Sequence, residues 1–196
     1  KREGYITAIV PLINYYTYGF KLDKIYIKNN QSYYNNLTCI KINKNNLMLL
    51  KAFIKECTIN YECIIIPNIE NLSNLIKTNN LFIYGILKKN KLISCYIFKD
   101  SGILYNKQKS IECISTLFNN VYDHATFIDG FNISLSECIN NTKAKYLSVE
   151  DISNNDIIIN YLYSKILNYY IKYPTSLFLY NYASFPCNNR LSLLLC

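Results

Sequence analysis

The chain has 196 residues, of which 51% are hydrophobic and 15% aromatic, and it carries a formal net charge of +8. This length and apolar content predict one domain, or at most two small ones, with a sizeable core, and they exclude an intrinsically disordered chain. The positive charge fits either a solvated surface or an acidic ligand, such as a phosphate-bearing cofactor or an anionic membrane face. Nucleic acid is not expected as a partner, because the lysines are scattered and no basic stripe interleaves with aromatic residues.

The chain has eight cysteines, none in a CxxC pair, and a single histidine, His124. This pattern argues against a metal cluster and favours cysteines that pack as small core side chains in a reduced, cytoplasmic protein. A secreted protein stapled by disulfides is the alternative. No signal peptide or membrane-spanning run is visible, and the chain does not begin with methionine, so we expect a fragment or a processed piece.

The first part of the chain predicts short strands at residues 5–10, 15–20, 24–28 and 38–42, with Pro11 ending the first of them. Helices are expected at 44–57, where Leu47, Leu50 and Ile54 share one face, and at 68–78, just after Pro67. The apolar runs 81–87 and 92–98 flank a polar turn and predict a β-hairpin.

A strand at residues 109–118 is expected to be central in the sheet. It is followed by a helix at 132–141, a strand at 145–149, a helix at 153–169 capped by Ser153 and Asn154, and final strands at 177–182 and 191–196. Antiparallel strands that lead into a βαβα unit predict a mixed α/β sheet with helices on both faces. No linker divides the chain, so residues 1–196 are predicted to be a single domain.

The familiar catalytic motifs are absent. All five glycines are isolated, so neither a P-loop nor a dinucleotide fingerprint can be built, and no HExxH or GxSxG occurs. His124 is expected to lie in a loop, in a structural or merely exposed role. The remaining chemistry is of the kind that backbone groups, hydroxyls and a terminal carboxylate can supply.

The chain ends inside an apolar run. Residues 191–195 are apolar apart from Ser192, and Cys196 carries the α-carboxylate. A charge beside apolar residues is costly unless it is paired or used. On the pattern alone, the favoured interpretation is an edge strand whose last residue reaches water.

Several strings along the chain resemble one family. Residues 178–182 (Phe-Leu-Tyr-Asn-Tyr) are similar to its Tyr-Leu-Tyr-Asn-Trp strand. The loop with Pro186 is similar to its Pro-containing loop, and the terminal residues 191–196 are similar to its Gly-Leu-Val-Leu end. Residues 109–119 resemble its Lys-Ser-Leu-Lys-Ala-Ala-Tyr-Ser-Phe-Tyr-Asn strand, and the hairpin precedes them as expected. Glu3-Gly4 with Thr7-Ala8 stands where the family has Glu-Gly…Tyr-Thr-Ala-Gly. Residues 14–17 stand where it has Arg-Tyr-Trp-His. The family is glycylpeptide N-tetradecanoyltransferase (N-myristoyltransferase), and the resemblance to its C-terminal half covers nearly the whole chain.

The resemblance implies an N-acetyltransferase-like (GNAT-related) fold and transfer of myristate from myristoyl-CoA to the N-terminal glycine of protein substrates. It implies no metal and no permanently bound cofactor. Myristoyl-CoA is a co-substrate, bound mostly by an N-terminal half that this chain lacks. The chain would be the peptide-binding half of a monomer.

The resemblance also implies site residues. The terminal carboxylate of Cys196 would be the general base, with its pKa raised by the neighbouring leucines at 193–195. Thr7 would hold the substrate amine, Tyr15 would line the peptide groove, and Ser115 and Asn119 would be substrate-binding positions on the middle strand.

Three departures from the family pattern bear on activity. Thr17 stands in place of a histidine, Ser115 in place of a tyrosine, and Lys172-Tyr173-Pro174 in place of an acidic Gly-Asp-Gly turn. The oxyanion hole belongs to the missing half, so this chain alone is not expected to turn over. Alternatives are a non-catalytic interaction module that kept the fold, an unrelated GNAT-like domain, or a basic ligand-binding domain.

Overall fold

The computed structural model describes residues 10–22, 36–105, 107–119, 122–165, 171–179 and 187–195. Its strands are β1 Val10–Lys21, β2 Leu37–Lys41, β3 Cys63–Ile65, β4 Leu81–Lys88, β5 Lys91–Tyr105, β6 Gln108–Phe118, β7 Tyr146–Glu150, β8 Ile171–Leu179 and β9 Ser192–Leu194. Its helices are α1 Leu47–Cys57, α2 Ile69–Lys77, α3 His124–Thr142 and α4 Asn155–Lys165, with 3-10 turns at Lys44–Asn46 and Asn189–Leu191.

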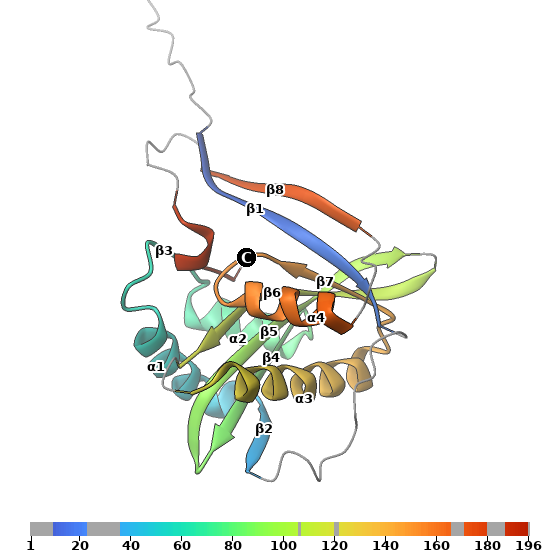
Figure 1. The fold of residues 1–196 in the computed structure, drawn as a ribbon. Coiled ribbons are helices and arrows are strands. Elements are labelled where there is room, and N and C mark those ends of the chain that lie inside the picture. Colours follow the sequence, from blue (N-terminus) through green and yellow to red (C-terminus); the bar gives the residue numbers. More distant parts are fainter. Residues whose placement is uncertain are drawn as a thin grey trace, which may run out of the picture.

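Seven strands form one twisted sheet in the order β2-β4-β5-β6-β7-β1-β8 (Figure 1). All neighbours are antiparallel except β6 and β7, which are the parallel strands of a βαβ unit closed by α3. The strand at 109–118 is therefore central, as predicted. A separate parallel pair joins β3 to β9.

The sheet is covered on both faces, and its core side chains alternate accordingly. On β4, Phe82, Tyr84 and Ile86 belong to the core under α3 and α4, whereas Leu81 and Ile83 belong to the core under α1 and α2. This period of two is what an extended strand between two apolar layers requires. The predicted mixed α/β sheet with helices on both faces is confirmed.

The hairpin between β4 and β5 is also confirmed. Its turn residues Lys89 and Asn90 have φ angles of 50° and 62°. Two successive left-handed residues form the type I′ turn, whose twist matches that of the flanking strands.

The prediction that Pro11 ends a strand is wrong. Pro11 lies inside β1, opposite Phe178 of the edge strand β8, and a bulge at this point accommodates it. The expected strand at 15–20 is thus the later part of one long strand. The predicted strand at 24–28, and all but the last residue of the one at 5–10, lie outside the described residues.

Two helix starts differ from the prediction. Helix α3 begins at His124, eight residues early, because the Asp123 side chain accepts a hydrogen bond from the Thr126 amide and caps it. His124 is therefore helical and not in a loop. Helix α4 begins at Asn155, because Ser153 has a φ of 55° and leaves the helical region.

The last predicted long strand is displaced. Strand β8 begins at Ile171, and Pro174 pairs with Tyr16 within it. Because β8 is an edge strand, proline is tolerated there. Lys172-Tyr173-Pro174 is therefore part of a strand and does not form the turn that the resemblance assigned to it.

Candidate functional site

Strands β6 and β7 run parallel and then separate. Their pairing ends at Cys113 and Val149, and Ile114 is an extra residue in β6 between the partners of Phe98 and Ile97. A bulge of this kind bends the strand and leaves a gap in the sheet beside it.

The buried side chain of Asn155, the first residue of α4, bridges this gap. Its Nδ2 donates hydrogen bonds to the carbonyl oxygens of Glu150 (2.7 Å) and Cys113 (3.3 Å). Its Oδ1 accepts one from Thr116 Oγ1 at 2.8 Å. One amide thus satisfies polar groups of both separating strands, as a buried site requires.

The C-terminal strand β9 lies against the same region. Ser153 Oγ donates to the carbonyl of Ser192 at 2.6 Å, and Ser115 Oγ of β6 lies 3.4 Å from Ser153 Oγ. The Leu195 amide donates to the carbonyl of Ile65 at 2.9 Å. Residues 193–195 are at most 3% exposed, so the chain enters the core as it approaches Cys196.

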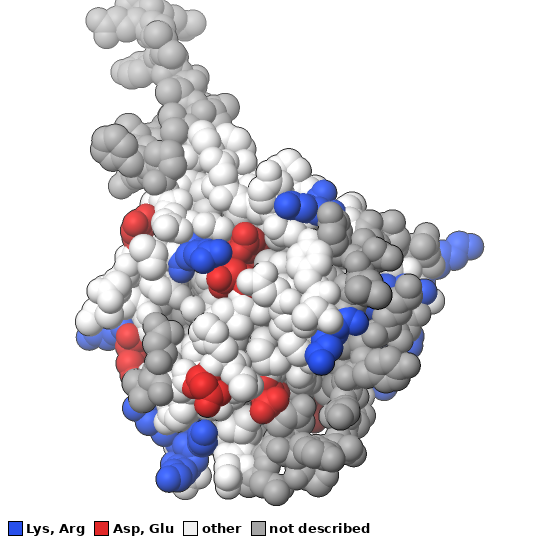
Figure 2. Space-filling model, viewed as in Figure 1, with Lys and Arg blue, Asp and Glu red and all other residues white. Residues whose placement is uncertain are grey.

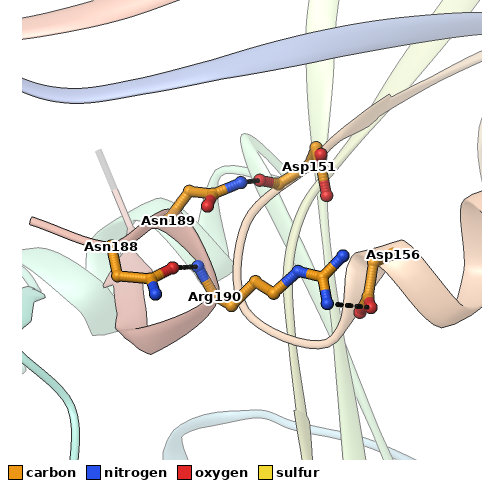
Figure 3. Close-up of polar contacts among 5 residues, drawn as sticks. All are labelled: Asp151, Asp156, Asn188, Asn189 and Arg190. Carbon is orange, nitrogen blue, oxygen red and sulfur yellow. Dashed lines mark hydrogen bonds and ion pairs between the residues drawn. The ribbon is translucent and has the colours of Figure 1, made fainter.

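A set of polar contacts fixes the segment that leads into β9 (Figure 3). Asn188 Oδ1 accepts a hydrogen bond from the Arg190 amide, and Asn189 Nδ2 donates to the carbonyl of Asp151 at 2.5 Å. Arg190 Nη1 lies 3.3 Å from Asp156 Oδ2. The contacts with Asp151 and Asp156 tie the segment to the loop after β7 and to the first turn of α4, and so fix the position where β9 begins.

Two carboxylates lie on the sheet face that carries β9. Glu112 of β6 is opposite Lys99 of β5, and Glu150 of β7 is opposite Thr17 of β1. Burial raises the pKa of Glu150 to about 7 and Glu112 adds to the rise, while Lys99 and a hydrogen bond from Tyr15 oppose it. Burial also raises the pKa of Glu112. A carboxylate that titrates near neutrality can attract a cation and exchange a proton at physiological pH.

Tyr15 connects these carboxylates to the end of the chain. Its ring packs against the apolar cluster of Leu12, Ile13, Ile152 and Leu194, and it hydrogen-bonds to Glu150. The acidic face and β9 therefore meet at Tyr15.

The structure brings only some of the predicted site residues together. Tyr15 packs on the cluster that contains Leu194 of β9, and Ser115 reaches β9 only through Ser153. Asn119 lies beyond the end of β6 and donates to Glu56 Oε1 of α1 at 2.8 Å. Thr17 is buried, and its hydroxyl lies 2.9 Å from that of Thr175. Thr7 and Cys196 lie outside the described residues.

Sequence reasoning missed Glu112, Glu150, Ser153 and Asn155 as site residues. Each looks like an ordinary strand or helix-cap residue, and only the pairing of β6 with β7 brings Glu112 beside the other three. A carboxylate on an otherwise apolar strand, as at Glu112 and Glu150, was the one available signal.

Among the described residues, no group of three His, Cys, Asp or Glu side chains is arranged to hold a metal ion. In the same part of the chain, no helix is long and apolar enough to cross a membrane. Figure 2 shows the basic residues dispersed over the visible face, without a continuous stripe.

No protein-family model and no curated protein matches the sequence. Solved structures do match the fold. A Saccharomyces cerevisiae N-myristoyltransferase with bound myristoyl-CoA and inhibitors has 14% identity and a TM-score of 0.63, over 96% of this chain and 58% of that chain. An aminoglycoside acetyltransferase from an uncultured soil sample, in complex with sisomicin, has 17% identity and a TM-score of 0.52, over 67% and 88% of the two chains.

A third match is the ribosomal-protein-alanine N-acetyltransferase of Brucella melitensis, with 9% identity and a TM-score of 0.50, over 67% of this chain and 90% of that chain. The chain thus spans most of the acetyltransferases but little more than half of the yeast N-myristoyltransferase. Likeness at such low identity shows the fold alone. The chain has the mixed α/β fold of the GNAT N-acetyltransferases, as the resemblance implied.

Proposed function

We propose that this chain is the peptide-binding half of an N-acyltransferase of the N-myristoyltransferase type. The observation that carries the proposal is the course of β9, which takes the chain toward Cys196 through the core and beside the Glu112–Glu150 face. The match over 96% of this chain supports the choice of this type over the smaller acetyltransferases. The sequence resemblance supports it independently.

The proposed reaction joins a glycine amine to an acyl thioester. The amine nitrogen attacks the thioester carbonyl, the C–S bond breaks, and CoA leaves as the thiolate. The attacking amine must be neutral, so its ammonium form has to lose a proton to a base. We assign this role to the terminal carboxylate of Cys196, because buried leucines at 193–195 desolvate its surroundings and so favour a raised pKa.

The Glu112–Glu150 face has a supporting role in this proposal. A substrate amine is cationic in water, and two half-buried carboxylates attract it toward the end of β9. Glu150 hydrogen-bonds to Tyr15, which supports the role in the peptide groove that the resemblance gives to Tyr15. Thr7 holds the amine, as the resemblance implies.

The two remaining site residues act less directly. Ser115 is fully buried and lies next to Ser153, so it contributes by holding β9 in place. Asn119 orients the end of β6 through Glu56. Myristoyl-CoA is the proposed co-substrate, and the resemblance assigns most of its binding to the other half of the family's fold.

A second function is favoured by a specific observation. Hydroxyl and amide groups at Thr17, Ser115 and Asn119 all pair within the chain. Because Thr17 and Ser115 are also buried, these groups have a structural role here. That role suits a non-catalytic interaction module that kept the fold and binds N-terminal peptides without acylating them.

One experiment separates the two functions. The full-length polypeptide that contains this chain is incubated with myristoyl-CoA and a peptide with N-terminal glycine, and the product is analysed by mass spectrometry. We expect an amide-linked acyl group on the peptide and none on its N-acetylated control. Peptide binding without any acyl transfer would contradict the enzyme and support the interaction module.

A further inference from the structure

A groove lined almost wholly by aliphatic side chains lies between α1, α2 and the segment that joins them. Its volume is about 460 Å³. Its walls include Leu47, Leu50 and Ile54 of α1, Ile64 and Ile66 of the joining segment, and Ile69 of α2. It is separate from the Glu112–Glu150 face and takes no part in the proposed acyl transfer.

The rims of this groove are exposed to water. The exposed fraction is 82% for Ile59, 45% for Ile64, 40% for Ile66 and 44% for Ile69. Clustered exposed aliphatic residues on a folded protein mark an interaction site. A small apolar molecule at the bottom of the groove would leave these rim residues exposed to water. An elongated occupant that contacts both rims would bury them.

The charges along the groove have one sign. Lys51 and Lys55 line it one helical turn apart on α1. Neither has an acidic partner in the part of the chain that the structure describes. The groove therefore complements an apolar surface that is flanked by carboxylates.

The groove offers few hydrogen bonds to an occupant. Apart from the two lysines, its polar side chain is Thr58, whose Oγ1 already donates to the carbonyl of Ile54 at 2.8 Å. An extended peptide would leave backbone groups without partners there, whereas an α-helix pairs its own backbone groups. A second copy of this chain would bring the same lysines, not carboxylates.

We propose that this groove docks an amphipathic α-helix of another protein, which presents aliphatic residues at helical spacing and acidic residues toward Lys51 and Lys55. This is the helix-in-groove mode of recognition.

The test is a selection of helical peptides, displayed on phage, against the immobilised full chain. We expect enrichment of aliphatic residues at i, i+3 or i+4, and i+7, flanked by Glu or Asp. A synthetic peptide from the selection should lose binding to Ile64→Glu. Its affinity should fall by about tenfold or more for K51E/K55E, because like charges then oppose each other. A peptide with its acidic residues changed to lysine should recover binding to K51E/K55E.

Two matched variants control for general effects. Lys77→Glu removes an exposed lysine outside the groove. Phe178→Glu alters a side chain that is 50% exposed on β8. Both should bind the selected peptide as the parent does, and Ile59→Asp serves as a second groove variant if Ile64→Glu fails to fold. The proposal is overturned if no groove-dependent peptide emerges. It is equally overturned if the groove variants instead abolish self-association in sedimentation equilibrium or binding to anionic phosphatidylglycerol vesicles.

Discussion

The hydroxyl of Ser153 donates a 2.6 Å hydrogen bond to the main-chain carbonyl of Ser192, and so joins the loop after β7 to the last strand of the chain. Ser153 is 2% exposed and has a φ of 55°, a conformation that residues other than glycine rarely adopt. The contact holds β9 in its place beside β6.

Replacing Ser153 tests this contact. Ser153→Ala should lower the free energy of unfolding by about 1–3 kcal/mol, because the carbonyl of Ser192 loses a buried partner. Ser153→Gly loses the same bond but relieves the left-handed backbone, so it should retain more stability than the alanine variant. Urea unfolding measures both. A glycine variant less stable than the alanine variant would contradict this account.

Replacing Asn155 should lower the free energy of unfolding more than replacing any other polar side chain between β6 and β7. Asn155→Ala leaves Thr116 and the carbonyls of Cys113 and Glu150 without this partner, and should cost about 2–4 kcal/mol. Asn155→Asp keeps the acceptor but turns a carboxylate oxygen toward two carbonyls, so between pH 4 and pH 7 it should lose more stability than the parent protein does. The neighbouring variant Asn154→Ala is the control. Equal stability of the two alanine variants would refute the bridging role.

The raised pKa of Glu150 predicts that the stability of the folded chain falls as the pH rises toward 7. Burial raises its pKa in the folded chain to about 7, above the ordinary value of 4.5, so the folded state binds the proton more tightly than the unfolded state. Its contribution to stability is therefore fully present below pH 4.5 and is lost as the pH rises to about 7.

Glu150→Gln should remove this loss and stabilise the chain by about 1–3 kcal/mol at pH 8. Urea unfolding between pH 4 and pH 8 measures the effect, with Glu137→Gln on the exposed side of α3 as the control. The same loss of stability between pH 4 and pH 8 in the parent protein and in Glu150→Gln would contradict the raised pKa of Glu150.

Helices and turns are predicted best from the sequence where neighbouring residues alone determine them. The turn at Lys89-Asn90 and helices α1 and α2 follow from polar turn residues and from helical periodicity, and the structure places them as expected. Helix α3 was predicted too short because Phe127, Gly130 and Phe131 break a simple amphipathic pattern, although all three are buried. The start of that helix is set by Asp123, whose side chain accepts a hydrogen bond from the Thr126 amide.

Strand pairing overrode the local proline signal at Pro11 and the turn that the resemblance assigned to residues 172–174. Pro11 and Pro174 both lie within strands, because a bulge or an open sheet edge removes the need for their missing N–H. The candidate site is harder still. Glu150, Ser153 and Asn155 lie close together in sequence, but Glu112 is almost forty residues earlier, and only the pairing of β6 with β7 brings it beside them.

The central claim is that the main-chain carboxylate of Cys196 accepts the proton of the substrate amine. The direct measurement is the acylation rate of the full-length polypeptide after one glycine is appended to Cys196, compared with Cys196→Ser. The account predicts that the extension lowers kcat by about a hundredfold or more, because it displaces the base, whereas Cys196→Ser retains activity, because it removes only the thiol. An undiminished rate for the extended protein would contradict the account.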